Sequence, residues 1–232
     1  MTSSSKIYKT EAIVLKHFPY GEGDYILTLY TPNLGKIRLI AKGARKITSK
    51  LGGHIEPLMH SSLLIRKGTN LGTINQAELL HSHRSIRENL GRLSQAMYFC
   101  ELLDHITPDE EPHYHLFKLL QETLNILSEN PQRMLISYFQ MQLLQQTGFM
   151  PELYTCVECN IVIQPGRHRF LADRGGVVCD QCQPVGPAPL PLSLQTLKVM
   201  RFLQSGQSFP EISRLHPQEK TLGELNKLLT AF

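Results

Sequence analysis

Two closely spaced pairs of cysteines constrain this chain more than any other feature of its sequence. Cys156 and Cys159 form the first pair, Cys179 and Cys182 form the second, and the full spacing is C-x2-C-x19-C-x2-C. Each Cys-x-x-Cys turn can aim two sulfurs at one point, and two such turns joined by a hairpin make the tetrahedral thiolate cage that Zn²⁺ prefers. Four thiolates leave no open position for water or substrate. The sequence therefore predicts one structural Zn²⁺ in a zinc ribbon.

The segment between the two pairs fits a short hairpin. Residues 168–172 are typical of a strand, residues 173–176 of a turn, and Val177-Val178 leads back to the second pair. Asn160 follows the first pair, where the chain often needs a left-handed residue, and Asn tolerates that conformation better than most residues. The alternatives are two disulfides or four free thiols, and disulfides would require an oxidising compartment.

Nothing in the sequence indicates export or insertion into a membrane. The first residues are polar and lack an apolar signal core. No apolar run approaches the roughly 20 residues of a membrane span. We therefore expect a cytoplasmic protein, with a bacterial cytosol as the default. The fifth cysteine, Cys100, lies in an apolar helical run and is expected to be a small core residue.

The basic residues gather in the N-terminal third of the chain. Residues 1–80 hold eleven Lys and Arg against five Asp and Glu, a net charge of +6, whereas the rest carries thirteen and fifteen, a net charge of −2. The chain of 232 residues as a whole has a net charge of only +4. A basic region of this kind favours a polyanionic partner, of which nucleic acid is the commonest.

Hydrophobic patterning predicts an α+β protein. Five short runs in the first eighty residues are typical of strands and suggest a small Greek-key barrel of the oligonucleotide-binding type, the OB-fold; they are residues 8–17, 25–30, 36–41, 58–66 and 72–80. From Ser85 the period becomes helical. We expect the second helix to be capped by Thr107 or Asp109, the third to span 134–147, and a last helix to run from about Glu219 to Phe232.

These patterns predict four regions along the chain. They are an OB-fold nucleic-acid-binding domain at 1–81, the first part of a helical domain at 82–150, a zinc-binding element at 151–185, and the C-terminal part of the helical domain at 186–232. The Pro-rich run 184–191 is interpreted as a linker that leads to Ser193, a plausible N-cap.

An unbroken basic stretch is the main functional signal. From Tyr25 to Ile55 there are six cations and no acid. Phosphate contacts are therefore predicted for Lys36, Arg38, Lys42, Arg45, Lys46 and Lys50. The alternative is a solvated surface loop. Four aromatic residues could stack on bases, or each could belong to the core or an apolar rim; they are Phe18, Tyr20, Tyr25 and Tyr30.

Signals of catalysis are poor, and no catalytic residue is predicted. The sequence contains no phosphate-binding loop, no Gly-x-Ser-x-Gly and no His-Glu-x-x-His. The pairs His81/His83 and His113/His115 could ligate a metal, but solvated or capping roles are simpler. Asp109–Glu111 is the densest run of carboxylates and is interpreted as an acidic first turn of a helix. A metal-dependent hydrolase and a zinc-ribbon nucleic-acid-binding regulator are the alternatives to a non-catalytic DNA-binding protein.

Several motifs occur in the order known from one bacterial family. They are Glu11-Ala-Ile-Val-Leu15, Tyr20-Gly-Glu-Gly-Asp24, Thr31-Pro-Asn-Leu-Gly-Lys36, Ala41-Lys-Gly-Ala-Arg45 and Gly148-Phe-Met-Pro-Glu-Leu153, followed by the cysteine pairs. The chain resembles the RecO family of DNA repair and recombination mediators over residues 8 to about 205.

The resemblance implies more than the residues do by themselves. It implies an OB-fold followed by a helical domain with an inserted zinc element. It also implies binding of single-stranded and double-stranded DNA, annealing of complementary strands, and loading of RecA together with RecR on DNA covered by single-strand-binding protein, at the nucleoid. Arg133 and Arg201 are candidates for a groove that takes the C-terminal tail of single-strand-binding protein, with solvated arginines as the alternative.

Overall fold

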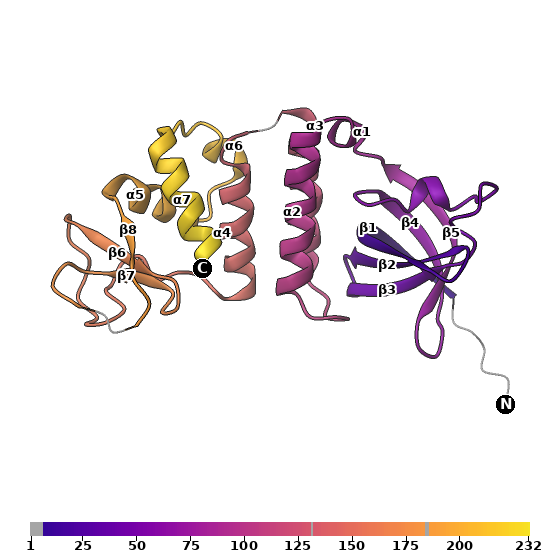
Figure 1. Ribbon diagram of the computed structural model, residues 1–232, viewed down its shortest axis with the longest axis horizontal. Helices are drawn as coiled ribbons and strands as arrows, with labels where there is room; N and C mark the ends of the chain where they lie inside the picture. Colours follow the sequence, from indigo (N-terminus) through magenta and orange to yellow (C-terminus); the bar gives the residue numbers. More distant parts are fainter. Residues whose placement is uncertain (1–6, 131, 184–185) are drawn as a thin grey trace. The chain divides into compact units, whose positions relative to one another are not determined.

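Five strands close into a barrel in the N-terminal part of the chain (Figure 1). The structure is a computed structural model that describes residues 7–130, 132–183 and 186–232. The strands are β1 (Ile7–Tyr20), β2 (Asp24–Thr31), β3 (Gly35–Ala41), β4 (His60–Arg66) and β5 (Gly72–His81). Their order is β1-β2-β3-β5-β4, and β4 pairs back with β1. β3 and β5 are parallel, and the other pairs are antiparallel. The predicted OB-type barrel and the α+β class are confirmed.

Alternation along the strands explains the barrel interior. Residues two apart point to the same face of a strand, and the inward positions of β2, β3 and β4 carry Leu27, Leu29, Ile37, Leu39, Leu63 and Ile65. The short 3₁₀ helix η1 (Gly52–His54) lies in the long connection between β3 and β4. That connection contains most of the basic stretch described above.

Three helices complete the first unit. They are α1 (Arg84–Arg87), α2 (Leu90–Ile106) and α3 (Tyr114–Glu129). α2 packs against α3 and β1, and Figure 1 shows α2 and α3 side by side. The expected start of the second helix at Thr107 or Asp109 is wrong, because α3 begins at Tyr114 with His113 as its N-cap. Residues 109–111 are instead in the connection between α2 and α3.

The chain divides into two compact units, residues 1–131 and 132–232. This boundary differs from the expected one after residue 81, because α2 and α3 pack on the barrel strands β1 and β2. The grouping of 82–150 with 186–232 into one helical domain therefore stays a prediction. Three parts of the predictions fall outside the described residues: the start of the polar N-terminus, the start of the Pro-rich run and the end of the zinc-binding element. The residues that are not described are 1–6, 131 and 184–185.

The second unit joins four helices to a small sheet. The helices are α4 (Leu135–Thr147), α5 (Leu194–Gln204), α6 (Phe209–Ile212) and α7 (Glu219–Ala231), and the sheet has the order β7 (Gly176–Val178), β6 (His168–Leu171), β8 (Leu190–Leu192). α4 ends at Gly148 with φ +80°, and Ser193 caps α5, as expected. Phe170 and Val177 from the sheet share one apolar core with Met200 and Leu225 from the helices.

The third strand of this sheet includes the last two residues of the Pro-rich run, so the expected linker is shorter than predicted. Leu190–Leu192 pairs with β6, with Pro191 opposite Arg169. A proline lacks the N–H that an inner strand must donate, but an edge strand tolerates it. The predicted hairpin of β6 and β7 is confirmed. None of the helices in the described part of the chain combines the length and apolarity that crossing a bilayer requires.

Candidate metal centre and nucleic-acid interface

The four paired cysteines meet at one point. The sulfur atoms of Cys156, Cys159, Cys179 and Cys182 all lie within 4.8 Å of one another. Cys156 Sγ is 3.9 Å from Cys182 Sγ, and Cys159 Sγ is 3.8 Å from Cys179 Sγ. A tetrahedron with metal–sulfur bonds of about 2.3 Å has edges of about 3.8 Å, whereas a disulfide requires about 2.05 Å. The donor set therefore fits a tetrahedral metal ion and is compatible with zinc.

Backbone geometry aims these sulfurs. Asn160 has φ +59°, so the first turn uses the left-handed residue that the sequence indicated, and its N–H donates to the Cys156 carbonyl at 2.9 Å. The Cys179 N–H points at Cys156 Sγ at 3.5 Å. Burial alone would raise the pKa of Cys156, but the N–H groups directed at its sulfur lower it to about 6. Hydrogen bonds with Cys179 and Cys159 instead raise the pKa of Cys182, so binding of a metal would have to displace the proton from that thiol.

The metal centre is anchored in the core of the second unit. Arg169 on β6 donates to the carbonyls of Cys179, at 3.3 Å, and Cys182, at 2.5 Å, which ties the second pair to the sheet. Gly176 is required at the start of β7, because an added Cβ would lie 2.6 Å from the Glu152 carbonyl oxygen. The site is therefore connected to packed elements on both sides.

The candidate histidines do not form a second metal site among the described residues, and two of them have other roles. His83 is buried and caps α1, its Nδ1 lies 3.1 Å from Ser128 Oγ, and burial lowers its pKa to about 4. His113 caps α3. Cys100 is buried in α2, and burial raises the pKa of its thiol to about 12. Among the described residues, the four paired cysteines are the one group close enough to hold a metal ion.

Four of the six predicted phosphate contacts lie together on the long β3–β4 connection. We call residues 42–53 the basic loop; its cations Lys42, Arg45, Lys46 and Lys50 are all exposed. In the described part of the chain, no carboxylate lies within 4 Å of any of these four charges. Their charge is therefore available to a polyanion.

Hydrogen bonds connect the basic loop to the turn between β1 and β2. Asp24 accepts the Gly43 N–H at 2.7 Å, and the Arg45 N–H donates to the Gly23 carbonyl at 3.0 Å. Gly43 has φ +63°, a conformation that L side chains rarely adopt. These bonds hold the cations beside the last residues of β1, where the chain turns.

Two of the four candidate aromatic residues are exposed at that end of β1. Phe18 and Tyr20 are 54% and 52% exposed, and Lys16 Nζ lies 5.6 Å from the centre of the Phe18 ring. For Tyr30 the core alternative holds, because its side chain is fully buried in the barrel. Tyr25 is half-buried and stacks on His17 with ring centres 4.1 Å apart.

Lys36 differs from the four cations of the basic loop, because its ammonium group is already engaged by acidic residues. Its side chain is only 7% exposed and donates to the Asp104 carbonyl at 2.5 Å. It also lies 3.3 Å from a carboxylate oxygen of Asp104 and 3.3 Å from one of Asp109. Arg38 is exposed but pairs with Asp109 at 3.2 Å. Both acids come from later in the chain, so the acid-free run did not reveal them.

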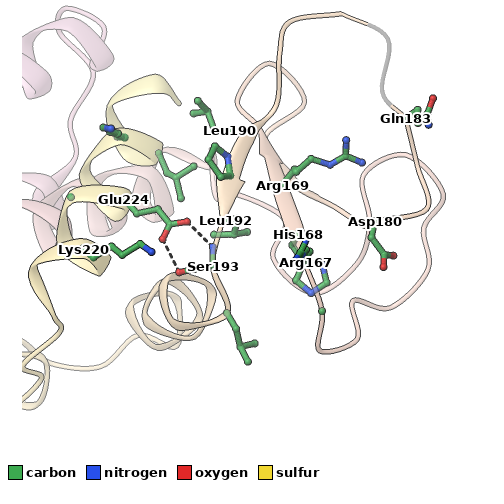
Figure 2. Close-up of a pocket in the computed structure, with 16 residues that line it drawn as sticks. Arg167, His168, Arg169, Asp180, Gln183, Leu190, Leu192, Ser193, Lys220 and Glu224 are labelled. Carbon is green, nitrogen blue, oxygen red and sulfur yellow. Dashed lines mark hydrogen bonds between the residues drawn. The ribbon is translucent and has the colours of Figure 1, made fainter.

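An apolar groove, which the sequence did not reveal, crosses the second unit (Figure 2). We call it the ribbon groove; it has a volume of about 920 Å³ and lies between the β6–β8 edge and α7. Its apolar lining includes Leu190, Leu192 and Leu228, and its exposed cations are Arg167, Lys220 and Lys227. Two carboxylates also line it: Asp180 is exposed, whereas Glu224 accepts hydrogen bonds from the Ser193 N–H and hydroxyl at 2.6 and 2.7 Å.

The two arginines considered for a docking groove lie elsewhere. Arg201 donates from Nε and a terminal nitrogen to the Leu153 carbonyl, at 3.0 and 2.6 Å, and its guanidinium covers the Tyr154 ring. Arg133 forms an ion pair with Glu219. Neither residue lines the ribbon groove.

Comparison with known proteins relates both units to one family. The family models "Recombination protein O N terminal" and "Recombination protein O C terminal" match residues 4–83 and 87–232. A protein from Dehalococcoides mccartyi is 37% identical over 225 residues, which cover 97% of this chain and 88% of the relative. A protein from Roseiflexus is 34% identical over 98% of this chain and 80% of the relative. A protein from Bacillus subtilis is 34% identical over 97% of this chain and 87% of the relative. All three relatives are named DNA repair protein RecO.

Proposed function

Because the chain belongs to the RecO family and so has a role in DNA repair and recombination, we propose that it acts as a mediator without catalytic activity of its own. In this proposal it binds single-stranded and double-stranded DNA and anneals complementary strands. Together with RecR it helps to load RecA on DNA covered by single-strand-binding protein. It would work in the bacterial cytoplasm, at the nucleoid.

The observation that carries this proposal is the basic loop. Four exposed cations without acidic partners, next to the exposed rings of Phe18 and Tyr20, combine the two features that single-strand binding uses. Cations neutralise the phosphates and release counterions, whereas aromatic rings stack on bases without choosing a sequence. In OB-folds the loop between the first two strands is one of those that bind oligonucleotides, and the basic loop is hydrogen-bonded to that turn through Gly23 and Asp24.

Annealing requires no ATP hydrolysis on this interpretation. Base pairing lowers the free energy once two strands meet, and the obstacle is the repulsion between their phosphate backbones. A basic surface lowers that repulsion because it replaces the counterion atmosphere of each strand. We therefore propose that Lys42, Arg45, Lys46 and Lys50 contact phosphates and that ATP has no part in the reaction.

The metal of the second unit is proposed to be one structural Zn²⁺. Cys156, Cys159, Cys179 and Cys182 would hold it, and four thiolates leave no open coordination position. The ion would stabilise the fold of the sheet rather than supply chemistry, because metal binding and folding are coupled in such sites. The hydrolase alternative is less favoured, because no candidate histidine belongs to a group of three or more ligands close enough to hold a metal ion among the described residues.

The ribbon groove is proposed as the docking site for the C-terminal tail of single-strand-binding protein. An acidic tail with apolar side chains would place those side chains on Leu190 and Leu194, the two lining leucines with accessible surface. Its carboxylates would face Arg167, Lys220 and Lys227, which are exposed around the groove. This placement replaces Arg133 and Arg201, whose guanidinium groups are engaged elsewhere.

The decisive experiment mixes complementary strands coated with single-strand-binding protein and follows duplex formation with and without ATP. We expect the protein to accelerate annealing equally in both conditions. The triple basic-loop variant, in which alanine replaces Lys42, Arg45 and Lys46, should lose most of this acceleration. A matched control replaces three exposed cations of the second unit, Arg174, Lys198 and Arg214, and so makes the same change in net charge.

Three outcomes would contradict the proposal. Absolute dependence on ATP would point to an energy-consuming step. Equal loss of annealing in both triple variants would mean that bulk charge, not the basic loop, is responsible. Binding that prefers one duplex sequence over single strands would favour the alternative of a zinc-ribbon regulator.

A further inference from the structure

We propose that Asp109–Glu111, the acidic segment, is a built-in competitor of DNA that occupies the free edge of β3 and neutralises Arg38. A bound strand then reaches Arg38 only where it displaces this segment. The inference rests on the proposed DNA-binding function and adds a form of regulation to the same barrel. All of its residues belong to the first unit.

The first half of β3 lacks a strand partner on one side. β2 pairs with β3 along its whole length, but β5 pairs with it only at Leu39 and Ile40. The acidic segment takes part of this edge: Asp109 forms a parallel bridge with Lys36, and the Glu110 N–H donates to the Lys36 carbonyl at 2.8 Å. An unpaired edge is a template for another extended chain. Here the connection between α2 and α3 occupies it.

The carboxylate of Asp109 forms ion pairs with two cations, the buried Lys36 and the exposed Arg38. One oxygen lies 3.3 Å from Lys36 Nζ, and the other lies 3.2 Å from a terminal nitrogen of Arg38. Lys36 keeps Asp104 as a second partner. The side chains of Arg38 and Asp109 are 55% and 45% exposed. Exposed ion pairs are weak and screened by salt, so a phosphate can replace Asp109 at Arg38.

The pair stands at the mouth of a cavity of about 830 Å³ between β3 and the loop that joins β4 to β5. Leu39 contributes apolar lining, Arg38 and Lys67 contribute positive charge, and Asp109 and Glu110 contribute negative charge. In OB-folds the second and third strands and the loop between the fourth and fifth strands are the surface that binds oligonucleotides. The two carboxylates therefore lie where they would repel the phosphates of a strand on that surface.

The segment is held in a strained, closely fitted conformation. Glu110 has φ +58°, which costs energy for a residue with a side chain. A Cβ added to Gly35 would lie 1.9 Å from the Glu111 carbonyl oxygen, so the docked segment requires glycine there. Burial, followed by the charge of Glu110, raises the pKa of Tyr8, and burial with Glu111 does the same for Tyr30. Strain of this kind persists only while surrounding contacts maintain it, and loss of the contacts favours release.

The test is the isosteric change Asp109→Asn, with binding to an oligo(dT) strand followed by fluorescence anisotropy over a range of salt concentrations. One additional phosphate contact steepens the salt slope for single strands by about 0.7, which corresponds to about 5-fold tighter binding at 0.1 M salt. Glu129→Gln is the matched control, because it removes one exposed negative charge from the same unit. We expect the control to bind like the wild type.

The change Arg38→Ala, made in both backgrounds, assigns the effect to one cation. It should abolish the gain of Asp109→Asn, and in the wild type it should weaken binding less than Arg45→Ala does. Comparison of Arg38→Ala with Arg45→Ala in the wild-type background tests the proposal even if Asp109→Asn impairs folding. Equal affinity of Asp109→Asn and Glu129→Gln, or equal losses for Arg38→Ala and Arg45→Ala in the wild type, would overturn the inference. Absence of any salt-dependent binding by the wild type would instead refute the proposed function.

Discussion

Replacement of Lys36 by methionine separates a structural lysine from a DNA contact. Lys36 Nζ is surrounded by two carboxylates and the Asp104 carbonyl, and its side chain is 7% exposed. Removal of one member of a buried ion pair costs about 3–5 kcal/mol, because the partner charge remains buried. Asp104 also pairs with Lys16, and Asp109 is 45% exposed. Both charges keep some compensation, so we expect the low end of that range, about 3 kcal/mol.

The rate at which a thiol reagent labels Cys100 measures this loss of stability. It lies in α2 one helical turn before Asp104, and its thiol is 2% exposed. A thiol reagent reaches it only when the first unit opens, and the labelling rate follows the open population when closing is fast. A loss of about 3 kcal/mol should accelerate labelling of Cys100 by about 150-fold. Peptide mapping by mass spectrometry distinguishes Cys100 from the four paired cysteines.

The control is Lys50→Met, which removes an exposed cation of the basic loop. In Lys50→Met, Cys100 should be labelled at the wild-type rate, but the salt slope of single-strand binding should fall by about 0.7. In Lys36→Met, Cys100 should be labelled faster, and the salt slope should be unchanged. The opposite pattern, with Lys36→Met as stable as the wild type and its salt slope reduced, would refute the structural assignment. It would restore the phosphate contact that the sequence predicted.

The same ion cluster predicts a dependence on pH. Burial alone would raise the pKa of Asp104, but Lys16 and Lys36 lower it below its usual value. A carboxylate with a lowered folded pKa contributes stability above its unfolded pKa of about 3.9, and this contribution is lost as the pH falls through the folded pKa. The difference in stability between the wild type and Lys36→Met should therefore narrow below about pH 4. A constant difference between pH 7 and pH 3, measured by urea unfolding, would contradict this account.

Three further predictions address the metal, the basic loop and the aromatic residues. Cys156→Ser should lose one bound metal ion, as measured by elemental analysis, and its small sheet should become more sensitive to limited proteolysis. Its first unit should still bind DNA. Purified wild type that contains no metal would contradict this prediction. The triple basic-loop variant should lose about 2 units of salt slope and about 100-fold in affinity for single strands at 0.1 M salt, and an unchanged slope would identify a merely solvated loop. Alanine in place of Phe18 or Tyr20 should cost about 1–3 kcal/mol of single-strand affinity if each stacks on a base, without a change in salt slope; anisotropy titrations at two salt concentrations measure both quantities.

Local chemistry made several features predictable from the sequence by itself. The spacing of the four cysteines predicted that their sulfurs cluster where they could hold a metal ion, because a Cys-x-x-Cys turn brings two sulfurs together within four residues. Alternation of apolar residues located the five barrel strands, and Gly148 and Ser193 marked helix ends. The acid-free run identified the exposed cations of the basic loop correctly as a group.

Contacts between distant segments decided what the sequence could not. Lys36 belongs to the same basic run as Lys42, but it is buried because Asp104, 68 residues later, closes over it. Tyr30 carries a polar hydroxyl and is followed by the polar Thr31 in the sequence, yet the barrel encloses both side chains completely. The last two residues of the Pro-rich run belong to β8 because β6 offered them a free edge. A local pattern shows which side of an element is apolar. Only the tertiary structure shows which other element covers that side and which charges it brings, because those partners come from parts of the chain that no local window contains.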